Sequence, residues 1–182
     1  MNRWQLHLAI KQLQAGGIIA YPTESVYGLG CDASNLYAVS RLLSLKKRSY
    51  NKGLILLVSD INQAKKFIKP LTSKQLEKIN TTSKRATTWL INKQPEVSVL
   101  LSGNHEKLAI RVTSNPVARA LCEAFDSPII STSCNLNKKP TSNRVSVIRN
   151  KMLGSVDIIS GRCCEQEPSQ IIDLESMKVL RS

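Results

Sequence analysis

The sequence predicts one α/β domain over residues 1–182, a twisted mixed sheet with helices packed on it. Short apolar runs rich in β-branched residues recur along the chain, stretches with helical spacing of apolar residues separate some of them, and several runs follow one another with no helix between. Strands mixed with helices in this way are typical of a mixed sheet covered by helices. With 182 residues, 42% of them hydrophobic, the chain can bury one core.

The chain opens with a helix and a strand. Apolar residues recur at helical spacing from Trp4 to Leu13, and the pattern stops at Gly16-Gly17, where a helix end is expected. The apolar run 17–21 predicts a buried strand that Pro22 closes.

A second helix and a second strand follow. Ser34 or Asn35 is expected to cap a helix whose apolar positions run from Leu36 to Leu45. The continuous β-prone run from Leu54 to Val58 predicts a strand covered on both faces.

The rest of the chain is predicted to hold shorter helices and a series of strands. Helices are expected around 60–68 and 73–80, capped by Asp60 and Thr72. The β-prone runs cover 87–91, 97–101, 108–113, 129–132, 156–160 and 171–174. Two helices interrupt them, one opened by Asn115-Pro116 and one opened by Ser142 or Asn143 and ending at Gly154.

Positive charge is concentrated in the first half of the chain. Of the formal net charge of +13, residues 1–95 carry +11, from fifteen Lys and Arg against four Asp and Glu. The densest cluster joins Lys46, Lys47, Arg48 and Lys52. Such a cluster attracts the phosphates of a nucleotide or of a nucleic acid. The scattered lysines between 65 and 93 are more typical of a solvated surface.

Composition also indicates a reduced, cytoplasmic protein. The five cysteines form an odd number with no C-x-x-C pair, which favours free thiols. No apolar run approaches the roughly 20 residues that cross a bilayer, and the N-terminus lacks the pattern of a signal peptide. His7 and His105 lie far apart in sequence, so no framework for a metal site is expected.

Two loops at strand ends are rich in hydrogen-bonding side chains. Residues 23–32 combine hydroxyls with glycines, and Ser131, Thr132, Ser133 and Asn135 end a later strand. Each loop is either a ligand site, as is usual where strands end in α/β proteins, or a structural turn. The glycine spacing of 28–33 lacks the strand context of a dinucleotide site, and the sequence contains no phosphate-binding P-loop or serine hydrolase elbow.

Taken together, the ordered segments resemble a known family. They are residues 21–32, Lys46-Lys47-Arg48 with Lys52-Gly53-Leu54, and residues 109–113, 131–135 and 168–173. In this order they resemble the YrdC/Sua5 family of L-threonylcarbamoyladenylate synthases, in its short bacterial form, TsaC. The resemblance runs from the first helix to about Asp173.

The resemblance implies an enzyme that converts L-threonine, bicarbonate or CO2, and ATP into threonylcarbamoyl-AMP and pyrophosphate, with Mg²⁺ bridging phosphate oxygens. The product would feed the N6-threonylcarbamoyladenosine modification of tRNA, after hand-over to a threonylcarbamoyl-transferase complex. The implied fold is a YrdC-like twisted mixed sheet around a concave, basic active site. The C-terminal Sua5 domain of longer relatives is expected to be absent.

Position by position, the resemblance also implies site residues. Its catalytic positions match Lys46, Arg48, Ser133 and Asn135, and its ATP-binding positions match these four residues together with Lys52. The positions expected to bind threonine are Thr23, Arg111, Ser131 and Ser169. A guanidinium can bind a carboxylate through two parallel hydrogen bonds, which suits Arg111 to the carboxylate of threonine. No protein ligand for a metal is expected.

One segment departs from the family, and one alternative function stays open. Family members carry W-P-G-P-x-T where this sequence reads approximately Ser83-Lys84-Arg85-Ala86-Thr87-Thr88, so Thr88 keeps the threonine and Arg85 is a new candidate for phosphate contact. The alternative is a non-catalytic RNA-binding protein with a basic cleft, for which the charge of +13 is the whole argument. Its weakness is the aromatic content of 4%, because aromatic side chains usually stack on RNA bases.

Overall fold

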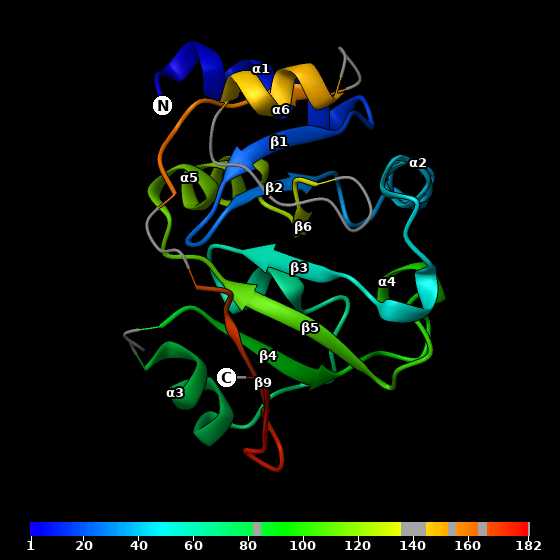
Figure 1. Cartoon of the computed structure of the whole chain (residues 1–182). Helices are drawn as coiled ribbons and strands as arrows, with labels where there is room; N and C mark the ends of the chain where they lie inside the picture. The colour runs from blue at the N-terminus through cyan, green and yellow to red at the C-terminus, as the bar shows by residue number, and fades with distance from the viewer. Residues whose placement is uncertain (82–84, 136–144, 153–155, 164–166, 182) are drawn as a thin grey trace.

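A computed structural model describes residues 1–81, 85–135, 145–152, 156–163 and 167–181 (Figure 1). The helices of this described part are α1 (Arg3–Gln14), α2 (Leu36–Lys46), α3 (Ser73–Asn80), α4 (Val99–Ser102), α5 (Pro116–Phe125) and α6 (Val145–Met152), with 3-10 helices η1 (Tyr50–Lys52) and η2 (Ile61–Ala64). The strands are β1 (Ile19–Pro22), β2 (Tyr27–Gly30), β3 (Ile55–Val58), β4 (Thr87–Asn92), β5 (Lys107–Val112), β6 (Ile129–Ser133), β7 (Asp157–Ile158), β8 (Gln170–Asp173) and β9 (Val179–Arg181).

The strands form one mixed sheet, which confirms the predicted fold class. Its order is β7-β1-β2-β6-β3-β5-β4-β8-β9. The pairs β1–β7, β3–β5 and β4–β8 are parallel, and the other neighbours are antiparallel. Strand β6 pairs with both β2 and β3. It therefore connects the β1–β2 hairpin, whose turn is the first loop, to β3 and its neighbour β5.

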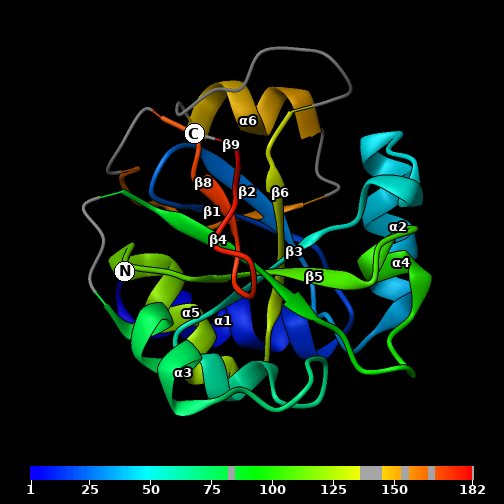
Figure 2. The ribbon, with the colours of Figure 1, turned by 90° about the horizontal axis from the view of Figure 1, so that it is seen from below.

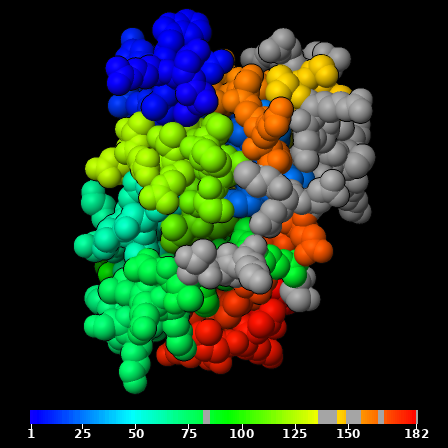
Figure 3. Space-filling model, turned by 90° about the vertical axis from the view of Figure 1, so that its left-hand side faces the viewer, coloured from blue at the N-terminus to red at the C-terminus, as the bar shows by residue number. Residues whose placement is uncertain are grey.

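Helices cover both faces of the sheet. In Figure 2, α1, α3 and α5 lie on one side of the sheet and α6 lies on the other. A hydrophobic cluster between α1, α5 and the sheet contains Leu13, Tyr21, Leu57 and Leu121, all with zero exposure. On the face shown in Figure 3, α5 lies between α1 above and the region of α3 below. The larger cluster extends from Leu42 of α2 across the strands.

Strand β2 requires a close approach to its neighbour β6. A Cβ atom on Gly30 would lie 2.2 Å from the carbonyl oxygen of Ile130, a distance that no real side chain tolerates. The glycine therefore lets β2 pack tightly against β6, and this contact brings the first loop beside the end of β6.

Three expectations need correction. The predicted strand 97–101 is wrong, because Ser98 accepts a hydrogen bond from the backbone N–H of Leu100 and begins the helix α4. The predicted helix 60–68 contains only the short 3-10 helix η2. Strands β2 and β9 and the 3-10 helix η1 were not expected.

The remaining elements were predicted correctly to within a few residues. Ser142, Asn143 and Gly154, the expected ends of α6, lie outside the described residues. Within the described part of the chain, no helix has the length and apolar character needed to cross a membrane.

Candidate functional site

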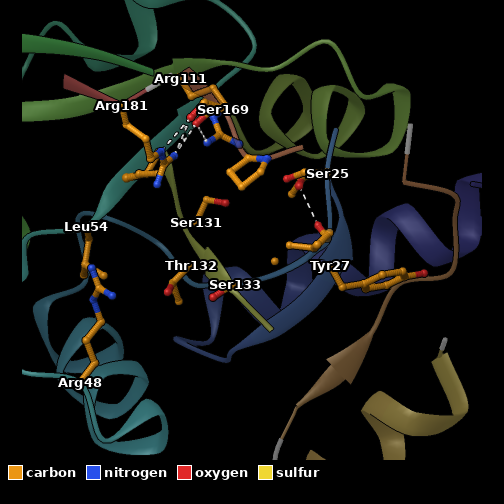
Figure 4. Close-up of a pocket in the computed structure, with 15 residues that line it drawn as sticks. Ser25, Tyr27, Arg48, Leu54, Arg111, Ser131, Thr132, Ser133, Ser169 and Arg181 are labelled. Atoms are coloured by element: carbon orange, nitrogen blue, oxygen red, sulfur yellow. Dashed lines mark hydrogen bonds between the residues drawn. The ribbon is translucent and has the colours of Figure 1, made fainter. Parts of the chain in front are cut away.

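Five parts of the chain meet at a cavity of about 400 Å³. It is lined by the first loop (Thr23 and Ser25 to Gly28), the Arg48 region with the start of β3, Arg111 of β5, the end of β6 (Ser131 to Ser133), and the C-terminal Pro168, Ser169 and Arg181. In Figure 4, Arg111, Ser169 and Arg181 lie together at one end of the cavity and Arg48 lies at the other, with Ser131, Thr132 and Ser133 between them.

Arg111 is a buried cation in the wall of this cavity. Its side chain points from β5, is only 6% exposed, and is surrounded by hydrogen-bonding groups. Its Nε donates to the hydroxyl of Thr88 at 3.1 Å, its Nη2 donates to the hydroxyl of Ser169, and its Nη1 lies 3.7 Å from Oε2 of Glu24. Burial lowers the pKa of the Arg111 guanidinium, whereas the charge of Glu24 opposes this shift.

The other hydroxyls expected to bind threonine also line the cavity. Thr23 is 3% exposed, and its hydroxyl donates to the backbone carbonyl of Val26 at 2.7 Å. A hydroxyl that donates one bond still has lone pairs to accept another. Ser131 lines the cavity and is 7% exposed, and Ser169 lines it at 1% exposure. The structure thus brings together the four predicted residues Thr23, Arg111, Ser131 and Ser169.

Lys46 and Asn135 lie behind the cavity wall and support it. The ammonium group of Lys46 donates to the backbone carbonyls of Ser133 and Asn135, and to the side-chain oxygen of Asn135 at 2.8 Å. The hydroxyl of Ser133 donates to the same Asn135 oxygen at 2.7 Å. Burial lowers the pKa of Lys46 to about 8. Of these three residues, only Ser133 lines the cavity.

Arg48 lies where this cavity meets a second one. Its Nη2 donates to the carbonyl of Gly53 at 2.9 Å, and its buried Nε has no hydrogen-bond partner among the described residues. Burial lowers the pKa of its guanidinium. The second cavity, of about 620 Å³, shares Arg48, Leu54, Ile55 and Arg181 with the first and contains Lys52. Lys52 is therefore near the first cavity but does not line it.

In the described part of the segment that departs from the family pattern, Thr88 contacts two residues that line the cavity. The hydroxyl of Thr88 lies 2.9 Å from that of Ser169 and accepts the hydrogen bond from Arg111. Arg85 does not line the cavity; it forms an ion pair with Glu167 at 3.1 Å and donates to the backbone carbonyl of Pro168. Ser83 and Lys84 lie outside the described residues.

Sequence reasoning missed two charged residues of this region. Arg181 of β9 lines the cavity and donates to the backbone carbonyl of Ser169 at 2.7 Å and to its hydroxyl at 3.1 Å. Glu24 is buried directly beside Arg111. The only signal for Arg181 is a cation in a short apolar run at the end of the chain, whereas Glu24 stands inside the first polar loop, where a carboxylate could have been singled out.

The described residues do not build a metal site of their own. No group of three or more His, Cys, Asp or Glu side chains comes together among them. The lining of the first cavity contains hydroxyls and arginines but no carboxylate in its described part. Since Mg²⁺ in proteins is usually held by one or two carboxylates together with substrate phosphates, these residues do not fit a magnesium ion held by the protein.

The fold and sequence are shared with characterised proteins. Residues 11–182 match the Sua5/YciO/YrdC family, described as Telomere recombination. The threonylcarbamoyl-AMP synthase of Saccharophagus degradans is 37% identical over 100% of this chain and 98% of its own length. That of Coxiella burnetii is 39% identical over 95% of this chain and 94% of its own.

A solved structure supports the architecture. The crystal structure of P. abyssi Sua5 complexed with L-threonine has a TM-score of 0.86 and 24% identity, and covers 95% of this chain. This chain spans about half (52%) of that Sua5 chain, so the likeness concerns one part of the longer protein. The match over residues 11–182 and the full-length similarity to the bacterial synthases together mean that the chain belongs to the Sua5/YciO/YrdC family.

Proposed function

We infer that this chain is a threonylcarbamoyl-AMP synthase, a nucleotidyltransferase that acts in the threonylcarbamoyladenosine modification of tRNA. Its relatives of that name match it over nearly their full length at 37% and 39% identity. The structural observation that carries the inference is the buried Arg111 in a cavity whose lining also contains several hydroxyl side chains. The substrates are L-threonine, bicarbonate or CO2, and ATP.

L-Threonine binds at the Arg111 end of the cavity. The guanidinium has five N–H donors, and hydrogen bonds to Thr88 and Ser169 occupy two of them. The remaining donors bind the carboxylate of threonine as a charge-assisted pair. The hydroxyls of Thr23 and Ser131 lie in the same walls and supply partners for the amine and the side-chain hydroxyl of the substrate. The Ser169 hydroxyl, which accepts from Arg111 and Arg181, orients the donors at this end of the site.

The phosphates of ATP bind toward the Arg48 end. Arg48 and the nearby Lys52 offset the negative charge that develops as pyrophosphate leaves. Ser133 lies in the cavity wall, and Lys46 and Asn135 hold it in place through the hydrogen bonds of its backbone carbonyl and its hydroxyl. Any Mg²⁺ would be held by ATP itself, since the described lining offers no carboxylate, and it would supply positive charge at the phosphates.

The chemistry rests on positioning and charge stabilisation. The amine of threonine adds CO2 and releases a proton to form a carbamate. A carbamate oxygen then attacks the α-phosphorus of ATP, and the bond from that phosphorus to pyrophosphate breaks on the opposite side. Holding both reactants in one cavity makes this step effectively intramolecular. The described cavity lining contains no carboxylate that could act as a general base, so solvent or bicarbonate accepts the proton from the amine.

The reactivity of the product determines which partner the enzyme needs. Threonylcarbamoyl-AMP is a reactive mixed anhydride, so an acceptor must receive it promptly, and we assign that role to a cytoplasmic threonylcarbamoyl-transferase complex. The net charge of +13 also favours weak contact with tRNA. A purely RNA-binding role rests on that charge alone and leaves the buried Arg111 unexplained.

An amino-acid panel tests the function. Purified protein is incubated with ATP, ¹⁴C-bicarbonate and one amino acid at a time, and pyrophosphate and labelled carbamoyl-adenylate are measured. We expect strong labelling with L-threonine and little with L-valine or L-serine, because valine lacks the hydroxyl and serine lacks the methyl group. Equal product from all three amino acids, or none from any, would refute the assignment.

A further inference from the structure

We propose that Glu24 is a positioning residue, a restrained counterion that keeps Arg111 charged and aligned without occupying the donors that bind the substrate. The inference rests on the proposed function, in which Arg111 binds the carboxylate of L-threonine. Glu24 does not line the cavity; it acts through the arginine that does.

One carboxylate oxygen of Glu24 is anchored where β5 leads into α5. Its Oε1 accepts hydrogen bonds from the hydroxyl of Thr113 at 2.6 Å and from the backbone N–H groups of Ser114 at 2.8 Å and Asn115 at 3.3 Å. Glu24 is only 2% exposed. Three donors on one buried oxygen prevent the carboxylate from turning toward the cavity.

The other carboxylate oxygen, Oε2, lies close enough to Arg111 to offset its charge but too far away to accept a hydrogen bond from it. Oε2 of Glu24 lies 3.7 Å from Nη1 and has no hydrogen-bond partner among the described residues. A charge-assisted hydrogen bond would be about 2.7–2.9 Å long. The pair therefore offsets the buried positive charge while the Nη1–H donors stay available for a substrate carboxylate.

Arg111 needs this partner because a buried charge without compensation is costly. Glu24 is the one acidic side chain paired with it in the described part of the structure. Burial alone would raise the pKa of the Glu24 carboxyl, but the hydrogen bond from Thr113 and the charge of Arg111 outweigh burial and lower it. Glu24 is therefore ionised at neutral pH.

The position requires a group that only accepts. In Glu24→Gln, one orientation of the amide points its NH2 at Arg111, and the other points it at the N–H groups of Ser114 and Asn115. Either orientation sets donor against donor. The substitution keeps the shape of the side chain, removes the charge and forces either the guanidinium or the β5–α5 corner to move.

Steady-state kinetics with matched variants test the proposal. We expect Glu24→Gln to raise the KM for L-threonine at least tenfold and to change the KM for ATP less than twofold. Glu24→Asp, which keeps the charge, should recover part of the loss. Glu123→Gln makes the same chemical change on the surface, where Glu123 pairs with Arg119, and should match the wild type.

A double-mutant cycle shows whether Glu24 acts through Arg111. In an Arg111→Ala background, which removes the guanidinium and its charge, Glu24→Gln should change kcat/KM for threonine less than twofold. A full tenfold effect in that background, an unchanged KM for threonine in folded Glu24→Gln, or parallel rises for both substrates would overturn the proposal. If Glu24→Gln does not fold, Glu24→Asp is judged by the same split between substrates. If Arg111→Ala alone leaves the KM for threonine unchanged, both this proposal and the assignment of Arg111 fail.

Discussion

The buried guanidinium of Arg111 contacts Thr88, Ser169 and Glu24. Replacing Arg111 with alanine removes the proposed carboxylate partner and should weaken threonine binding by about 2–3 kcal/mol, or roughly 30-fold to 150-fold. The affinity for ATP should stay within about twofold, because the proposed phosphate site is at the Arg48 end of the cavity, away from Arg111. Calorimetric titration of each ligand measures this. A parallel loss of both affinities would instead make Arg111 a structural residue.

Arg48 carries the prediction for the phosphate end. Arg48→Ala should reduce product formation tenfold or more, which corresponds to about 1.4 kcal/mol of lost transition-state stabilisation. Arg48→Lys should recover only part, because an ammonium cannot reproduce a planar fork of donors. Arg119→Ala, on an exposed face of α5, is the control. Wild-type turnover in folded Arg48→Ala protein would exclude this role.

The limits of the sequence are visible residue by residue. Thr23, Arg111, Ser131 and Ser169 were expected in one site and do line one cavity, because each stands at or near the end of a strand that the sheet brings together. Whether they bind threonine stays a prediction. The place of Lys46 behind the wall could not be predicted, since its three acceptors depend on how α2 packs against the end of β6.

At the scale of elements, the capping residue of α5 connects the helix to the site. The side chain of Asn115 accepts from the backbone N–H groups of Val117 and Ala118, and its amide donates to the carbonyls of Thr23 and Arg162. Asn115→Ala should lower the free energy of unfolding by about 2–4 kcal/mol, from the lost cap and the buried carbonyls it leaves unpaired.

Asn35 offers the matched comparison, since it caps α2 through the N–H of Ala38 from a less buried position. Asn35→Ala should cost only about 1 kcal/mol. Urea unfolding of both variants gives the two values. Equal losses would mean that the contacts of Asn115 with the first loop contribute nothing to stability.

The hairpin of β8 and β9 gives a prediction in pH. The hydrogen bond from Lys107, aided by the backbone N–H of Ser176, lowers the pKa of Asp173 to about 2. A depressed carboxyl pKa stabilises the folded state above the ordinary pKa of about 4, and this contribution is lost as the pH falls toward 2. The free energy of unfolding of Asp173→Asn should therefore depend less steeply on pH between 4 and 2 than that of the wild type. An identical dependence would place this acid sensitivity elsewhere.

Elements with a strong local signal were predicted, and elements that depend on tertiary contacts were not. The run from Leu54 to Val58 is apolar throughout and forms β3 in the centre of the sheet. The run 97–101 looks equally apolar, but the cap at Ser98 makes it helical. Strand β2 contains Gly28 and Gly30, which disfavour strands locally. It forms because it pairs with β6, and the absence of a side chain at Gly30 permits the close approach to the carbonyl of Ile130.

At the scale of the whole molecule, the site draws on nearly the entire chain. The residues that line the cavity extend from Thr23 to Arg181, so the site exists only when the whole sheet is formed. The fold class followed from the alternation of runs and helices, whereas the shape of the cavity depends on the C-terminal hairpin, whose strand β9 the sequence did not reveal. Arg181, which completes the wall, belongs to that strand.

A crystal structure of the protein with bound L-threonine tests the location of the substrate most directly. We expect the threonine carboxylate within about 3 Å of the Arg111 guanidinium, with Glu24 still beside the arginine and unshared with the ligand. The hydroxyls of Thr23 and Ser131 should face the amine and the side chain of the substrate. Threonine bound at another cavity, or bound here with its carboxylate turned away from Arg111, would contradict the account.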